Sequence, residues 1–275
     1  MLFTLSKLTI VSLLGTFIFA TIISFTSSKR LKEVLGPAIA GVGFCWIYSY
    51  FIQFPNSISD LTDIPELFAL MITVFLGVAI GSLQKIRYEN QQNWLSILAD
   101  FFLCVLALFL LIIPNASPTT MFIFVIWCLT LYRVRSYHQD YLPIVLMTFC
   151  ALVGLSIIAW QNGLFAELGL IIGAVSVILG ISVWLLLNRH HSMNISFIWP
   201  VFIILLISSN RIVENDSYLV APIFFIYLVY FADTVIAPIQ SESRLLPKLF
   251  YATKITSLAL LPIIMTLIMV LVIGY

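Results

Sequence analysis

Long apolar runs separated by short polar breaks are the feature of this sequence that most restricts its fold. One run extends from Leu164 to Leu187, and apolar sequence resumes at Ile195 after a mostly polar break over 188–194. About 20 apolar residues in a helix cross the roughly 30 Å hydrocarbon core of a bilayer. Charged residues are 9% and apolar residues 62% of the chain, which leaves too little polar surface for a soluble domain of this length. The sequence therefore predicts an all-α, polytopic transmembrane helical bundle that forms one membrane domain over residues 1–275.

Reading the apolar runs against the polar breaks predicts about ten membrane spans. The fifth and the eighth are short for a bilayer crossing, so we expect them to be half-buried or to extend into the neighbouring loops. The predicted spans are Leu8 to Phe25, Ala38 to Phe54, Leu67 to Leu83, Trp94 to Ile113, Met121 to Tyr132, Tyr141 to Trp160, Leu164 to Leu187, Ile195 to Ser208, Leu219 to Ile239 and Leu258 to Tyr275.

The basic residues predict the orientation of these spans. Eleven of the thirteen lysines and arginines lie in the loops that follow odd-numbered spans, and only Lys7 and Arg211 lie on the other face. Short cytoplasmic loops retain lysine and arginine, so both termini are expected outside. The formal net charge is +1, which gives no electrostatic basis for binding nucleic acid.

The four cysteines all fall inside apolar runs and show no CxxC spacing. We expect them to be buried small apolar groups, and we expect neither disulfides nor zinc ligands among them. They are Cys45, Cys104, Cys128 and Cys150.

Several segments on the predicted cytoplasmic side resemble the motifs of a known family. Residues 75–84 read Phe-Leu-Gly-Val-Ala-Ile-Gly-Ser-Leu-Gln, residues 185–188 read Leu-Leu-Leu-Asn, and residues 230–234 read Tyr-Phe-Ala-Asp-Thr. In span order and loop context the chain resembles a divergent member of the polyprenyl-phosphate N-acetylhexosamine-1-phosphate transferases, the peptidoglycan translocase-like enzymes of glycosyltransferase family 4. The resemblance covers nearly the whole chain.

This resemblance implies a location, a reaction and a cofactor. Family members reside in the bacterial inner membrane with a cytoplasmic active site. They move a sugar-1-phosphate from a UDP-sugar to undecaprenyl phosphate, a polyprenyl phosphate, with Mg2+ bridging phosphate oxygens. Membrane lipid, polyprenyl phosphate and a UDP-sugar are the partners expected on this basis.

The chain departs from the family at the acidic positions. Gly81 and Ser82 stand where the family has paired aspartates, and only Asp140 keeps a carboxylate in the 131–140 segment. The loop after Asn188 lacks the family's acidic motif, and the loop after Asp233 lacks its histidines. We therefore expect metal-dependent catalysis to be impaired or lost, with Mg2+ needed only if the protein is active.

The remaining polar residues near the predicted cytoplasmic face supply the site candidates. The catalytic or metal candidates are Asp233, Asp140 and Asp100, of which Asp233 and Asp100 lie inside predicted spans. An acid inside a span serves a wet functional site or pairs with an arginine or a backbone donor. The candidates for phosphate or nucleotide binding are Lys85, Arg87, Arg133, Arg135, His138, Asn188 and Arg189. The ordinary basic bias of cytoplasmic loops also explains the first five of these.

Three functions stay open on the sequence alone. The first is a transferase scaffold that has lost most of its catalysis, a pseudoenzyme. The second is a working transferase with relocated carboxylates. The third is an unrelated membrane transporter or assembly protein, for which no matching pair of broken helices is apparent.

Overall fold

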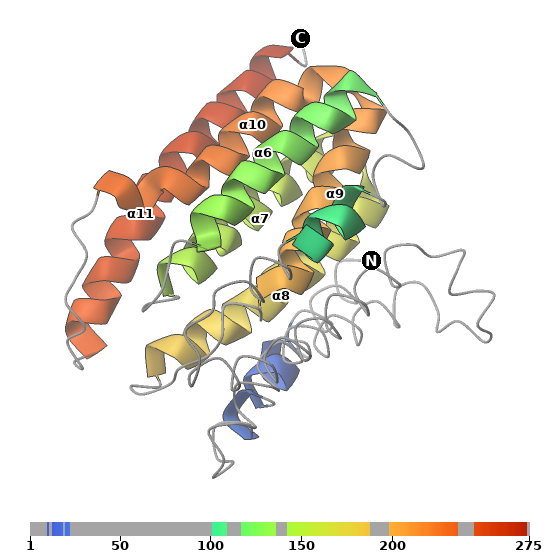
Figure 1. The fold of residues 1–275 in the computed structure, drawn as a ribbon. Coiled ribbons are helices and arrows are strands. Elements are labelled where there is room, and N and C mark those ends of the chain that lie inside the picture. The colour runs from blue at the N-terminus through green and yellow to red at the C-terminus, as the bar shows by residue number, and fades with distance from the viewer. Residues whose placement is uncertain are drawn as a thin grey trace.

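Every regular element in the described part of the chain is a helix (Figure 1). The computed structural model describes residues 10, 13–18, 20–22, 101–108, 117–135, 142–187, 198–235 and 245–273. Residues 13–18, 20–22 and 101–108 are helical. The elements that follow are α6 (Pro118–Arg135), α7 (Leu142–Gln161), α8 (Phe165–Leu187), α9 (Trp199–Asn215), η2 (Ser217–Leu219), α10 (Val220–Leu228), η3 (Val229–Val235) and α11 (Leu245–Ile273), where η marks a 3-10 helix.

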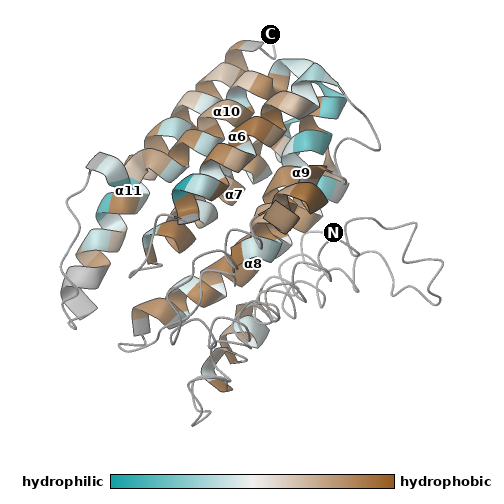
Figure 2. Ribbon diagram, in the orientation of Figure 1, coloured by the Kyte–Doolittle hydropathy of each residue, from teal (hydrophilic) through white to brown (hydrophobic). Residues whose placement is uncertain are grey.

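Four described helical segments are long and apolar enough to cross a membrane. They are Leu142–Gln161, Glu167–Leu186, Ser217–Thr234 and Leu249–Val272. Figure 2 shows that the helices are mainly hydrophobic along their length and that the strongly hydrophilic residues lie near helix ends. The chain is therefore a helical membrane protein, as its composition predicts. The number of ten spans and the outside position of the termini stay predictions, because the second and third predicted spans lie wholly outside the described residues and the first and fourth are described only in part.

The two spans that were short in the sequence are longer helices in the structure. The fifth is α6, which begins after Ser117, whose Oγ accepts a hydrogen bond from the Thr120 backbone amide at 3.1 Å. This N-cap and Pro118 in the first turn account for a start before Met121. The eighth is α9, which begins later than predicted and continues past Ser208 as far as Asn215. Both helices extend into regions that the sequence assigned to loops.

The last predicted span also has different limits. We expected a helix from Leu258, but α11 begins at Leu245. Lys248 and Lys254, which the sequence places in a cytoplasmic loop, are therefore helical residues. The ammonium group of Lys254 lies 4.6 Å from the centroid of the Phe250 ring. A helix of 29 residues exceeds the span length that the bilayer requires, so its amino-terminal turns can extend beyond the hydrocarbon.

A tight hairpin joins α7 to α8. Gly163 adopts φ +70, the Gly163 amide donates to the Trp160 carbonyl at 3.2 Å, and the Leu164 amide donates to the Ala159 carbonyl at 2.9 Å. This is the Schellman pattern of a helix that ends on a left-handed glycine. The predicted boundaries of the sixth and seventh spans are confirmed to within two residues.

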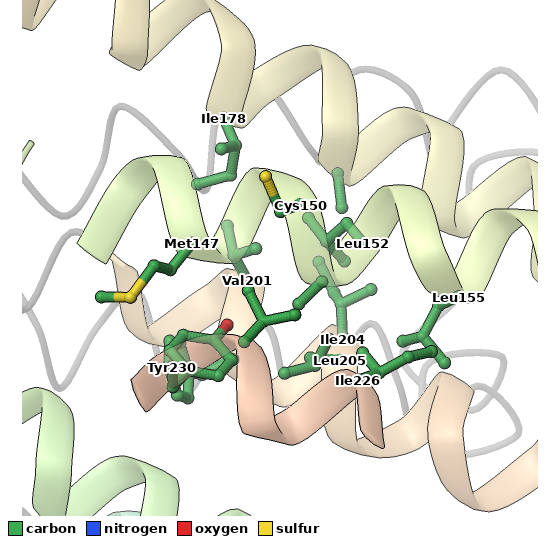
Figure 3. Packing of buried hydrophobic residues seen from close by; sticks show 14 of the residues in the cluster. Met147, Cys150, Leu152, Leu155, Ile178, Val201, Ile204, Leu205, Ile226 and Tyr230 are labelled. Carbon is green, nitrogen blue, oxygen red and sulfur yellow. The ribbon is translucent and has the colours of Figure 1, made fainter. Parts of the chain in front are cut away.

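α7 lies at the centre of the described bundle, with α8, α9, α10 and α11 packed against it. Figure 3 shows Cys150, Leu152 and Leu155 of α7 between Ile178 of α8 and side chains of α9, α10 and η3. Gly154 permits a close approach of α7 to α10, because a Cβ there would lie 3.3 Å from Cγ1 of Ile226. The indole nitrogen of Trp127 donates to the Phe202 carbonyl at 2.9 Å and so connects α6 to α9.

Candidate functional site

An ion pair connects two predicted site residues that are one hundred positions apart in the chain. Nη2 of Arg133 donates to Oδ2 of Asp233 at 3.0 Å and to Oδ1 at 3.2 Å. Arg133 lies in the last turn of α6, and Asp233 lies near the end of η3. The Arg133 side chain is 27% exposed and that of Asp233 is 10% exposed. The carboxylate is thus nearly covered, whereas part of the guanidinium remains accessible.

The backbone of η3 determines where Asp233 is placed. The sequence predicts one continuous span from Leu219 to Ile239, but the chain changes from α-helix to 3-10 helix at Val229. A 3-10 helix has three residues per turn, so Tyr230 and Asp233 lie on the same face of η3. Seven residues is long for this conformation, in which runs above three or four residues are uncommon.

Buried polar contacts hold this face of η3 against its neighbours. The Tyr230 hydroxyl lies 3.1 Å from Oγ1 of Thr148 on α7, and the Thr148 hydroxyl donates to the Ile144 carbonyl at 2.7 Å. The rings of Phe202 and Tyr230 have centroids 5.3 Å apart, and Figure 3 shows Tyr230 facing the buried cluster. One turn before Asp233, the segment is therefore fixed to α7 and α9.

For an acid inside a span, the sequence left open either a wet functional site or pairing with an arginine. Asp233 is paired with an arginine. A carboxylate that accepts hydrogen bonds on both oxygens from a guanidinium is already neutralised. A Mg2+ site requires several oxygen ligands. Among the described residues, no group of three or more histidine, cysteine, aspartate or glutamate side chains could hold a metal ion.

Of the other site residues predicted from the sequence, the structure describes only Arg135. Arg135 is the last residue of α6, two residues after Arg133 in the same last turn. The candidates that lie outside the described residues are Asp100, Asp140, Lys85, Arg87, His138, Asn188 and Arg189.

A second ion pair, which the sequence reasoning missed, lies at the opposite end of the bundle. Nη1 of Arg211 is 3.8 Å from Oε1 of Glu167, and Nδ2 of Asn210 donates to Oε1 of Glu214 at 2.9 Å. Glu167 is in the first turn of α8, beside the α7–α8 hairpin. The two ion pairs lie at opposite ends of the bundle, as expected for loops that follow odd-numbered and even-numbered spans. The end that faces the cytoplasm stays a prediction.

The sequence reasoning also missed a contact between two cysteines. Sγ of Cys104 lies 4.0 Å from Sγ of Cys128, and both residues are only partly buried. Cys150, by contrast, is buried as expected. Twenty-four positions separate the pair, and no local motif signals it. To predict the contact, one would need to know that these two spans are neighbours and which face each turns to the other. The sequence gives neither.

Comparisons of the chain with protein-family models, with curated proteins and with solved structures found no match.

Proposed function

We propose that this protein is a multi-pass scaffold of the bacterial inner membrane, of the polyprenyl-phosphate sugar-phosphate transferase type, that binds a phosphorylated lipid without metal-dependent transfer. The observation that carries the proposal is the engagement of both carboxylate oxygens of Asp233 by Arg133. The motif resemblance suggests the class of ligand. The ion pair supports a loss of metal-dependent catalysis, because it occupies the carboxylate that would bind the metal.

The ion pair weakens Asp233 as a metal ligand in two ways. A guanidinium at hydrogen-bonding distance repels a divalent cation that approaches the same carboxylate. Moving Arg133 away would leave a charge that is nearly covered by protein without its partner, which is strongly unfavourable. The arrangement therefore favours a neutral pair over an acidic metal site.

The same geometry favours an anion as the ligand of this end of the bundle. The guanidinium is the more exposed partner of the pair. Its planar set of donors matches phosphate oxygens as well as carboxylate oxygens. A lipid phosphate at the membrane surface would meet Arg133 at the end of α6, where the sequence also places Arg135.

The activity test uses the purified full-length protein in lipid nanodiscs with radiolabelled UDP-N-acetylglucosamine, undecaprenyl phosphate and Mg2+. We expect no release of UMP above that of protein-free nanodiscs. Mg2+-dependent release that disappears in Asp233→Asn would overturn the proposal in favour of a working transferase. Release that persists in Asp233→Asn would also overturn it and would exclude Asp233 as the metal ligand.

The binding test compares undecaprenyl phosphate with undecaprenol, which lacks the phosphate. We expect the phosphate to raise the thermal midpoint of the protein and the alcohol to leave it unchanged. Arg133→Gln should reduce this shift, whereas Arg211→Gln, at the other end of the bundle, should not. Equal shifts for both lipids, or none for either, would contradict phosphate binding.

A further inference from the structure

The contact between Cys104 and Cys128 brings two thiols from different helices together. Their sulfur atoms are 4.0 Å apart, and a disulfide bond is about 2.05 Å long. Closing that gap needs each sulfur to move by about 1 Å along the line between them. Rotation about the Cα–Cβ bond of each cysteine moves its sulfur atom over such distances.

This pair lies beside apolar surface that is exposed on both helices. On α6, Val125 and Leu129 flank Cys128 and are 54% and 59% exposed. On the other helix, Phe101 and Val105 flank Cys104 and are 63% and 44% exposed. Exposed apolar side chains in the middle of a membrane span face acyl chains. The two thiols are therefore accessible from the lipid side, through the seam between these helices.

We propose that Cys104 and Cys128 form an oxidisable dithiol whose electron acceptor is a lipid-soluble quinone. Both thiols lose their hydrogen atoms, one sulfur–sulfur bond forms, and the quinone takes up the two electrons and two protons to become a quinol. Charged oxidants such as glutathione disulfide are excluded from hydrocarbon, because burying their charges without partners is costly. This inference does not depend on the proposed lipid-phosphate function.

Oxidation would connect two segments that are otherwise held by packing. The disulfide would tie the helix over residues 101–108 covalently to α6, whose last turn carries Arg133. Cys128 is five residues before Arg133, about 7.5 Å along the helix axis. The tether would close a loop of the chain between residues 104 and 128 and so restrict the unfolded state.

The experiment uses the full-length protein in proteoliposomes, treated with glutathione disulfide or with a short-chain benzoquinone whose ring is fully substituted and so cannot add a thiol. The remaining thiols are then blocked with a maleimide, and the digested protein is examined by mass spectrometry. We expect the benzoquinone to produce a linked 104–128 peptide pair, two hydrogen atoms lighter than the separate peptides. Glutathione disulfide should leave both thiols available to the maleimide.

Three variants separate this specific pair from adventitious oxidation. Cys104→Ser and Cys128→Ser should each abolish the linked peptides, whereas Cys150→Ser, which changes a buried cysteine, should retain them. A normal elution volume in size-exclusion chromatography confirms that each variant is folded. Maleimide labelling of both thiols after benzoquinone treatment would overturn the proposal, as would linkage to Cys45 or equal oxidation by glutathione disulfide.

Discussion

Arg133 and Asp233 illustrate how few arrangements are available to charges in a membrane protein. Each is costly alone in a low-dielectric environment, and each becomes acceptable when the other supplies hydrogen bonds. Their contact at 3.0 Å and 3.2 Å satisfies both oxygens of the carboxylate. Removing one partner should therefore be more harmful than removing both.

We expect Arg133→Met to lower the free energy of unfolding by about 1.5–3 kcal/mol, because the carboxylate of Asp233 loses a charged donor while remaining nearly covered. The double variant Arg133→Met with Asp233→Leu should recover most of this loss, since neither charge is then buried. Denaturant unfolding in detergent, followed by tryptophan fluorescence, measures both effects.

A matched change at the other end of the bundle serves as the control for this pair. Arg211 is 3.8 Å from Glu167 and its side chain is 39% exposed. Exposed ion pairs contribute about 0–1 kcal/mol, so Arg211→Met should cost less than Arg133→Met. A double variant at 133 and 233 that is no more stable than the single Arg133→Met would contradict the pairing.

Gly163 is a second residue whose role can be tested in isolation. Its φ of +70 is a left-handed conformation, and a Cβ there would meet no atom within 4 Å. Gly163→Ala should therefore cost about 1–2 kcal/mol of stability from backbone strain alone. Gly163→Asn should cost less, because asparagine tolerates this conformation better. Equal losses in thermal unfolding for the two variants would argue against a backbone origin.

At the scale of elements, the position of Asp233 follows from the change of helix type at Val229. In an α-helix consecutive residues are rotated by 100° about the axis, so residues three apart are not in line. The 3-10 segment has three residues per turn and therefore aligns Tyr230 with Asp233. The hydroxyl of Tyr230 then contacts Thr148 while Asp233 meets Arg133. Contacts from α7 and α6 thus fix η3 on one face.

The packing of α7 against α10 and α11 depends on the absence of a side chain at Gly154. A Cβ there would lie 3.3 Å from Ile226 and 3.5 Å from Ile263. We expect Gly154→Leu to destabilise the protein by about 1–3 kcal/mol through overpacking. The thermal midpoint in detergent measures this change.

Gly15 is the matched control for Gly154. It also lies in a helical, apolar segment, and a Cβ there would meet no atom within 4 Å. Gly15→Leu should leave the thermal midpoint nearly unchanged. A similar loss in both variants would show that the effect of Gly154→Leu does not arise from the contacts of α7 with α10 and α11.

At the scale of the whole molecule, the two ion pairs mark opposite ends of one bundle. Arg133 and Asp233 lie where α6 and η3 end, and Glu167 and Arg211 lie near the α7–α8 hairpin. The basic bias of the loops predicts that the first end faces the cytoplasm.

Labelling of introduced cysteines in intact cells tests this orientation. In a variant with all four cysteines replaced by serine, a membrane-impermeant maleimide should label Ser217→Cys, in the exposed turn before α10, from outside. Ser243→Cys, between η3 and α11 in the sequence, should be labelled only after permeabilisation. The reverse pattern would invert the predicted topology.

Parts of the fold follow from local sequence. The apolar runs and the polar break between them predict α7 and α8 to within two residues. The sequence was less informative at α6 and α11, where helices continue through polar residues. Capping by Ser117 extends α6 beyond the limit set by hydropathy. Helix propensity continues α11 from Leu245 in the same way.

Hydropathy and the distribution of charge alone determined that this chain is a helical membrane protein, because the bilayer requires long apolar helices whatever their neighbours are. Only the tertiary structure decided that Asp233 meets Arg133 and that Cys104 meets Cys128. Such pairings depend on which helices are adjacent and on how each is rotated about its axis. A uniformly apolar helix shows little periodicity from which that rotation could be predicted.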